Sequence, residues 1–447
     1  MRRAAVPLLA LTVGFVLADS AVVTLALPDI LRHLGGTVAQ VAWVLIAFNL
    51  VLAIMVVPAA SLSVRSNPGP FCAIGVAVFA GASAACALAG SMSVLITARC
   101  IQGLGGAFAL IGCLELLVEA TDERRGVAAW IAAGVVGTAV GPAVGGLLTQ
   151  AFAWQSIFVV QVPVAVLAVP AALAVRGTVV HPVRRDRPAI GPNLALALLS
   201  AALTAALFLL VLLLVDGWNR SPAIAALTVS VVPVAAFAAG PLSRPLHATP
   251  TVEAATGCFL VAGGLVGLAL LPSADLAWTV LPQVLVGFGL GLTVDRLTTG
   301  AMRERLPRAV QGGWTIAARH AGVVFGLAIL TPVFTGDLRA AQTPAQEAIT
   351  ALVLDAPVRA QDKVALAQGL SDQLAKQRDR VPNLHPAFAK LDFPAEERPA
   401  ASELEGGLNS QLERAAARAF RDSFLVGAGL ALAAMASLIL IRRRVSS

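Results

Sequence analysis

Twelve apolar stretches, each about 20 residues long, alternate with polar connections along the 447-residue chain. The first six lie at 6–28, 39–62, 70–90, 92–117, 127–149 and 154–176, and the second six at 189–215, 221–242, 252–272, 276–299, 312–334 and 422–441. An α-helix of about 20 residues crosses the hydrocarbon core of a bilayer. Because every backbone polar group must be bonded internally there, each stretch is expected to be a helix. The pattern predicts an all-α integral membrane protein with twelve transmembrane helices in two six-helix halves.

Polar composition marks the boundaries between these parts. Segment 177–188 is rich in Pro and Arg and separates a six-helix N-terminal half, residues 1–176, from a six-helix C-terminal half, residues 189–447. A second hydrophilic segment, 335–421, lies between the last two apolar stretches. The chain therefore has two membrane halves, a linker, and one large polar insertion in the second half.

The insertion carries helix signals. Residues 359–380 and 400–420 are amphipathic and balanced in charge, and Thr343-Pro344 has the order of an N-cap followed by a proline in the first turn. We expect 335–421 to form a small helical cap outside the membrane. A flexible linker is the alternative.

The overall composition excludes an ordinary soluble protein. Hydrophobic residues make up 58% of the chain, charged residues 13%, and the mean hydropathy is +0.83, whereas soluble domains carry about 25% charged residues. All five cysteines lie inside apolar stretches and none forms a C-x-x-C pair. They are interpreted as small core residues rather than metal ligands or disulfides.

The arginines predict the orientation in the membrane. If the N-terminus is cytoplasmic, the short outer loops carry only Arg32 and Arg220. The inner side then carries sixteen arginines: Arg2, Arg3, Arg65, Arg124, Arg125, Arg176, Arg184, Arg185, Arg187, Arg244, Arg303, Arg305, Arg308, Arg442, Arg443 and Arg444. This bias follows the positive-inside rule, so both termini and the 177–188 linker are expected in the cytoplasm and 335–421 outside. The net positive charge of the chain is therefore explained by its orientation in the lipid bilayer, and no nucleic-acid partner is expected. Abundant Ala and Arg indicate a high-GC bacterial genome and hence a bacterial inner membrane.

Signatures of enzymes are missing from the sequence. It has no H-E-x-x-H, no G-x-S-x-G and no G-x-x-x-x-G-K-[ST], and its five histidines are scattered singly. We expect no catalytic residue, no metal site and no cofactor. Without a nucleotide site, a transporter would have to use an ion gradient or run downhill.

Ionisable residues inside apolar stretches are the strongest functional signal, because a charge at membrane depth is costly. They are Asp19, Arg99, Glu115, Asp295, Arg296, Arg319 and His320. Any one of them can be a structural ion pair that pins two helices. As a set, they favour a water-accessible pathway.

Four motifs support a resemblance to a known family. The first helix has LADSAVVTLALPDI, the fourth RCIQGLGGAF, the fifth GTAVGPAVGGLL, and the eleventh ARHAGVVFGLAIL. In this order and in these helices they resemble the drug:proton antiporter (multidrug efflux) branch of the major facilitator superfamily. The loop ASLSVRSNPG departs from the family pattern, since Val64 stands where the family has an acidic residue.

The fifth-helix motif also has a direct physical meaning. Gly137, Gly141 and Gly145 recur every four residues on one helix face, Gly146 follows, and Pro142 bends the helix. These glycines allow another helix to approach closely. In antiporters that this chain resembles, the motif is associated with export.

The resemblance implies a major facilitator fold and proton-coupled export of a small amphipathic compound, drug-like or a secondary metabolite, by alternating access. We expect a monomer whose partners are a small-molecule substrate and protons. A lipid or cell-envelope precursor translocator on the same fold, or a non-transporting membrane sensor, stays open as an alternative.

The expected depth of each ionisable residue in the membrane suggests its role. Asp19 and Arg99 are both expected about 10–14 Å below the outer surface, where Asp19 would carry the proton and Arg99 would be its partner. A fixed ion pair between the two helices is the alternative. The substrate cavity or inner gate is assigned to Gln102, Glu115, Asp295, Arg296, Arg319 and His320. In the outward-facing state, Asp295 is expected to pair with Arg319, or Arg296 with Glu115.

Overall fold

The computed structural model describes residues 2–35, 37–175, 186–243, 249–303, 305–355, 357, 359–376, 385–389, 394 and 396–446. Within them all regular secondary structure is helical. The N-terminal helices are α1 (Arg2–Leu34), α2 (Val38–Ser63), α3 (Pro68–Ala87), α4 (Met92–Ala120), α5 (Glu123–Ala151), α6 (Ser156–Val159) and α7 (Gln161–Ala174). The C-terminal helices are α8 (Ile190–Thr204), η1 (Ala205–Leu209), α9 (Leu210–Leu212), η2 (Leu213–Gly217), α10 (Pro222–Val229), α11 (Val231–Ser243), α12 (Pro250–Ala269), α13 (Leu276–Met302), α14 (Arg308–Asp355), α15 (Ala360–Lys376), α16 (His385–Phe388) and α17 (Arg398–Ser446).

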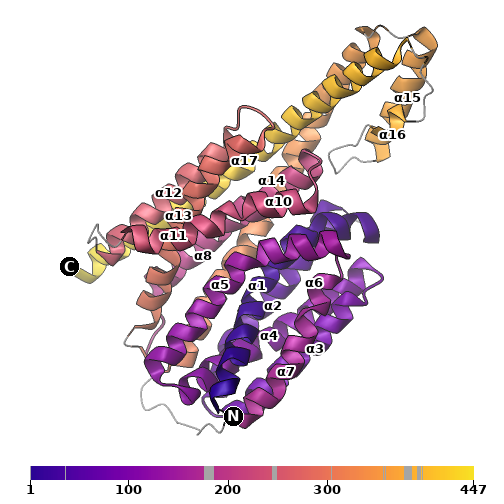
Figure 1. Ribbon diagram of the computed structural model, residues 1–447. Helices are drawn as coiled ribbons and strands as arrows, with labels where there is room; N and C mark the ends of the chain where they lie inside the picture. Colours follow the sequence, from indigo (N-terminus) through magenta and orange to yellow (C-terminus); the bar gives the residue numbers. More distant parts are fainter. Residues whose placement is uncertain are drawn as a thin grey trace.

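Twelve of these helical segments are long and apolar enough to cross a membrane, which confirms the predicted number of spans. Six precede the linker and six follow it. Figure 1 shows α1 to α7 as one bundle and the helices from α8 onward as a second bundle beside it. Of the predicted linker 177–188, residues 177–185 lie outside the described part of the chain.

The first span is longer than predicted. Helix α1 continues through Pro28 and ends at Leu34. A proline inside a helix removes one backbone hydrogen bond. Beyond it, however, Ile30 and Leu31 are completely or almost completely buried in the core of the protein. Their burial offsets the lost bond, and the helix therefore carries on for almost two more turns.

The polar insertion is helical and stands on the second bundle. Helix α14 runs without a break to Asp355, so the predicted helix start at Thr343-Pro344 is wrong: the span and the insertion share one helix. Helix α17 likewise joins the insertion to the last span. With α15 and α16 these extensions enclose a small apolar core that includes Leu366, Phe388 and Leu408. Figure 1 shows this bundle projecting at the end of the molecule opposite to the N-terminus.

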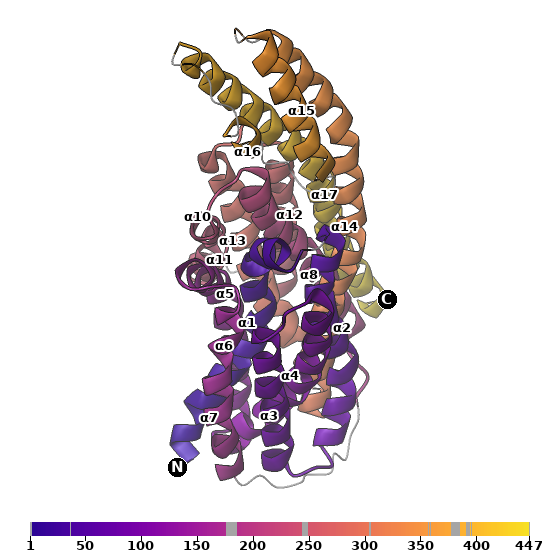
Figure 2. The same ribbon diagram turned by 90° about the vertical axis from the view of Figure 1, so that its right-hand side faces the viewer.

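The two bundles meet along two lines. On one side α14 runs alongside α2, as Figure 2 shows, and Gly313 lies against Ala60 and Val56. On the other side, the far end of α5 closes on α10: the Gln150 side chain accepts a 2.8 Å hydrogen bond from the backbone N–H of Ala223. The bundles are therefore held together along α2 and α14, and where the Gln150 end of α5 meets α10.

Candidate functional site

A buried ion pair lies in the middle of the N-terminal bundle. The guanidinium of Arg99, on α4, donates from Nη1 to Oδ2 of Asp19, on α1. Both side chains are completely shielded from solvent. Removing two charges from water is costly, so such a pair persists only when its geometry is good and its other hydrogen-bonding atoms are satisfied.

Uncharged polar side chains satisfy most of those atoms. Gln161, on α7, donates a 2.9 Å hydrogen bond from Nε2 to Asp19 Oδ1, and Gln102 donates to the same oxygen at 3.3 Å. Gln102 also accepts from Arg99 Nη1 at 2.6 Å and donates to Ser83 Oγ, on α3, at 2.8 Å. Four helices thus contribute to one buried network around a single carboxylate.

Arg99 has one atom that the network leaves unbonded. Its Nε donates to the backbone oxygen of Val44 at 3.1 Å, and its guanidinium carbon lies 4.3 Å from the centroid of the Phe48 ring. Its Nη2 is buried and has no hydrogen-bond partner. A buried guanidinium N–H without an acceptor is unfavourable, and it marks a position where an acceptor would be stabilised.

A second polar chain connects this region to the other bundle. His320, on α14, lies with Nδ1 2.6 Å from Oδ1 of Asn49, on α2. The same oxygen accepts a 3.1 Å hydrogen bond from Ser20, which follows Asp19 on α1. His320 and Asn49 are both buried. A polar link across the bundles therefore ends one residue away from the buried carboxylate.

The glycines of α5 bring α1 into position. A side chain at Gly137 would meet the backbone of Gly14, and one at Gly145 would lie 2.6 Å from the backbone oxygen of Val22. Gly141 lies against Ala18, the neighbour of Asp19. Their spacing therefore builds the close helix contact that the sequence predicts, and it fixes the part of α1 that holds the carboxylate.

Gly146 and Pro142 have different neighbours. Gly146 faces the other bundle, where a side chain would overlap Ala226 of α10. Pro142 lines a cavity between the bundles. One helix thus contacts α1 with one face and the C-terminal bundle with another.

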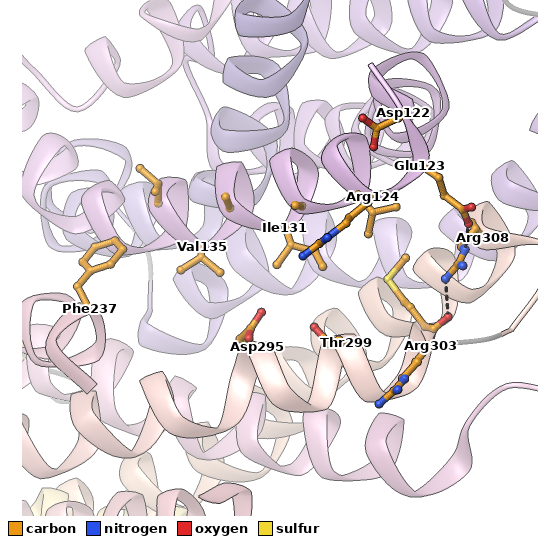
Figure 3. A pocket seen from close by; sticks show the side chains of 15 residues that line it. Asp122, Glu123, Arg124, Ile131, Val135, Phe237, Asp295, Thr299, Arg303 and Arg308 are labelled. Carbon is orange, nitrogen blue, oxygen red and sulfur yellow. Dashed lines mark hydrogen bonds and ion pairs between the residues drawn. The ribbon is translucent and has the colours of Figure 1, made fainter. Parts of the chain in front are cut away.

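A cleft of about 830 Å³ opens between the bundles at the Glu123 end of α5 (Figure 3). One wall is α5, with apolar residues including Ile131 and Val135, and the other is α13 with Phe237 of α11. Asp295 points from α13 into this space. At the rim, Arg308 of α14 forms an ion pair with Glu123.

A smaller cavity of about 150 Å³ continues from the cleft, with which it shares Val135, Phe237 and Asp295. Arg319 of α14 also lines it. Among the described residues no ion pair joins Asp295 to Arg319, so the predicted pairing of these two is not present in this state. The cavity is therefore mostly apolar and is lined by one acidic residue, Asp295, and one basic residue, Arg319.

The other predicted residues lie elsewhere. Arg296 points away from the cleft and pairs with Glu253 of α12 at 2.7 Å, so its predicted pairing with Glu115 is not present in this state. Adjacent residues on a helix point about 100° apart, and only Asp295 of the two faces the cleft. Glu115 accepts a 3.0 Å hydrogen bond from Ser63 of α2. Gln102 belongs to the buried network and not to the cavity.

Three residues of these networks are not predicted from the sequence: Ser83, Gln161 and Asn49. Each is an uncharged polar residue inside an apolar span, which is a signal for hydrogen bonding between membrane helices. Within the described residues there is no group of three or more His, Cys, Asp or Glu side chains able to hold a metal ion.

Comparison with known proteins places these features in a family. The family model described as Major Facilitator Superfamily matches residues 9–332. Two solved structures share the fold: a bacterial homologue of the human lysosomal transporter Spinster (TM-score 0.63, 16% identity, 98% of this chain and 96% of that one) and a proton-dependent oligopeptide transporter (TM-score 0.62, 10% identity, 99% and 100%).

Curated relatives match part of the chain. The multidrug resistance protein Stp of Mycobacterium tuberculosis is 37% identical over 33% of this chain and 28% of its own length. The methylenomycin A resistance protein of Streptomyces coelicolor is 34% identical over 52% and 49%. The multidrug efflux pump LfrA of Mycolicibacterium smegmatis is 34% identical over 36% and 32%. The matched part thus spans between about a quarter and a half of these relatives.

Proposed function

Because the chain belongs to the major facilitator superfamily, whose members are membrane transporters and not enzymes, we propose that it exports a small amphipathic compound in exchange for protons by alternating access. The names of the relatives support the direction and the substrate class, since they describe resistance and efflux proteins. The proposed substrate is a drug-like compound or a secondary metabolite.

The buried pair of Asp19 and Arg99 carries the proposal. A carboxylate shielded from water beside an arginine has two stable arrangements: ionised and paired, or protonated and released from the pair. Protonation removes the attraction between α1 and α4 and leaves Arg99 in need of an acceptor. Antiport requires that proton binding and substrate binding favour opposite conformers, and loss of the ion pair between α1 and α4 on protonation gives the proton such an effect.

The cleft and the cavity supply the path for the substrate. Their walls are mostly apolar, while Asp295 and Arg319 offer one charge of each sign. Such a surface binds an apolar body with a polar or charged group. In this fold, substrate sites lie between the two halves near the middle of the membrane, and this cavity also lies between the two halves.

The arginine bias supports the orientation. With both termini and the 177–188 linker in the cytoplasm, the cleft opens to the cytoplasm and the insertion 335–421 lies outside. In this state the end of α5 near Gln150 is closed. We place the protein in a bacterial inner membrane as a monomer with halves 1–176 and 189–447. A tag near Lys376 should report the outside, and a C-terminal tag the cytoplasm.

Efflux from cells or inside-out vesicles tests the function. Vesicles with the protein should accumulate cationic and neutral amphipathic dyes when a proton gradient is applied, and a protonophore should abolish accumulation. Movement of fluorescent lipids without any proton dependence would instead favour a lipid or envelope-precursor translocator. Absence of transport across a diverse panel, with the protein folded and inserted, would favour a sensor.

A further inference from the structure

The structure has an arginine-lined groove at the outer end of the C-terminal bundle. It has a volume of about 330 Å³ and lies between the connection from α12 to α13, residues 269–274, and one face of α17. Arg414, Arg418 and Arg421 line it from α17. They recur at helical spacing, so the three side chains lie on the same side of the helix.

The groove has an unbalanced charge. Its ten described lining residues include these three arginines and no acidic residue. All three arginines are exposed, and among the described residues none forms an ion pair. The one acid in the neighbouring connection, Asp275, is engaged as the N-cap of α13, where Oδ1 accepts a 3.0 Å bond from the N–H of Ala277. The contrast with the large cleft is clear, because its three arginines are balanced by three acids.

A fourth arginine adds positive charge and stiffens the wall. Arg220 donates from Nη2 to the backbone oxygen of Ala274, a lining residue, at 3.4 Å. Its Nε is buried and has no hydrogen-bond partner. The connection between α12 and α13 is thus held in place by Arg220, whose charge adds to that of the three arginines of α17.

The position of the groove relative to the bilayer indicates what kind of ligand it binds. Arg421 is followed by Asp422 and Ser423 and then by the apolar run of α17, and Arg414 lies two turns further out, about 10 Å along the helix. This range corresponds to the headgroup layer at one face of a bilayer. On the opposite wall Leu270, 57% exposed, ends α12 and continues the membrane surface of the helix. The arginines lie at the depth of a phospholipid's phosphate, and the exposed leucine lies at the depth of its acyl chain.

We propose that this groove binds the phosphate of an anionic phospholipid in the leaflet at this end of the protein. Guanidinium groups bind phosphate oxygens in a bidentate manner, and three of them without an acid favour a lipid with net negative charge over a zwitterionic one. The bound lipid would fix α17 against α12 and α13, the helices that must move together when the C-terminal half rocks. The site is separate from the transport path and does not depend on the proposed substrate.

Native mass spectrometry of the full-length protein in detergent tests this site. Phosphatidylglycerol and phosphatidylcholine are added in equal amounts, and the retained ratio is compared for wild type, Arg418→Gln, the triple variant Arg414→Gln/Arg418→Gln/Arg421→Gln, and Arg125→Gln. Arg125 is exposed near the cytoplasmic end and serves as a control for loss of one positive charge. Each groove arginine should contribute about five-fold to the preference for phosphatidylglycerol.

The expected result is a preference that is unchanged in Arg125→Gln, falls about five-fold in Arg418→Gln and disappears in the triple variant. Equal retention of phosphatidylglycerol by the wild type and the triple variant would overturn the proposal. Displacement of the lipid by millimolar inorganic phosphate, with phosphate adducts in its place, would also overturn it, because the groove would then be a site for a free anion. The exposed positions of the three arginines mean that the variants should fold, which circular dichroism checks.

Discussion

His320 of α14 and Asn49 of α2 are joined by a 2.6 Å contact between Nδ1 and Oδ1 at the centre of the interface between the bundles. The Asn49 amide is itself fixed, because its Nδ2 donates to the backbone oxygen of Leu45 at 2.8 Å. Its Oδ1 also accepts from Ser20, the neighbour of Asp19. Movement of the C-terminal bundle therefore acts on a hydrogen bond next to the buried carboxylate.

Replacing His320 by alanine should loosen the contact between α2 and α14. One hydrogen bond between membrane helices is worth about 1 kcal/mol, so the ratio of closed to open conformers should change about five-fold. Double electron–electron resonance between labels on α2 and α14 should show longer and broader distances. His33→Ala is the matched control, because within the described part of the chain the His33 side chain bonds only inside its own helix, to the backbone oxygen of Asp29. An unchanged distance distribution in His320→Ala would show that the bond does not hold the interface.

Alanine at Gly137 should disrupt the contact between α1 and α5. Its methyl group would overlap the backbone of Gly14, which cannot move without displacing α1. Such overpacking costs about 1–3 kcal/mol. Gly81→Ala is the control, because nothing lies within 4 Å of the position where its side chain would be. Thermal unfolding in detergent should show a lower midpoint for Gly137→Ala only; equal midpoints would contradict the close packing.

Asp295→Asn should change substrate preference rather than stability. Asp295 is exposed in the cleft and forms no ion pair within the described residues, so its charge is available to a cationic compound. A lost charge-assisted hydrogen bond should lower affinity for cationic dyes about ten-fold and leave that for neutral dyes unchanged. Fluorescence titration measures both. Asp29→Asn, outside the cleft, is the control; equal losses for both dye classes would indicate a structural effect.

The outer insertion should be removable. Its apolar core is separate from those of the membrane bundles, and its two membrane-proximal ends already touch, since the rings of Phe334 and Phe420 lie 4.3 Å apart. A short Gly/Ser linker in place of 340–410 should therefore leave the twelve spans folded and retain export. Size-exclusion profiles and dye efflux are the measurements. Normal insertion with complete loss of export would make the insertion a required part of the transporter.

The sequence predicts the twelve spans well because the length of an apolar run is a property of the segment itself. The end of α1 was placed too early, because a proline signals only the local loss of a hydrogen bond and not the burial of Ile30 and Leu31 that compensates it. The Thr343-Pro344 pair likewise signals a helix start, although α14 already runs through it. Local sequence signals for helix ends do not include the tertiary packing that can override them.

The buried site was only partly accessible from sequence. Depth along two spans brings Asp19 and Arg99 to similar heights, and the structure joins them. Depth does not say which face of a helix a residue occupies, so Arg296 was assigned to the cleft although it faces α12.

The most direct measurement for the whole account is proton-driven export by Asp19→Asn in proteoliposomes. Asparagine keeps the size of the side chain and one acceptor oxygen but cannot exchange a proton, so we expect no accumulation against a gradient while substrate still binds. Removing one partner of a buried pair can destabilise a protein by about 3–5 kcal/mol; the variant Asp19→Asn/Arg99→Gln removes both charges and should fold and bind but not couple. Asp29→Asn, on the same helix, should export normally. Export by Asp19→Asn with undiminished dependence on the proton gradient would contradict the account and leave Asp19 as a structural brace between α1 and α4.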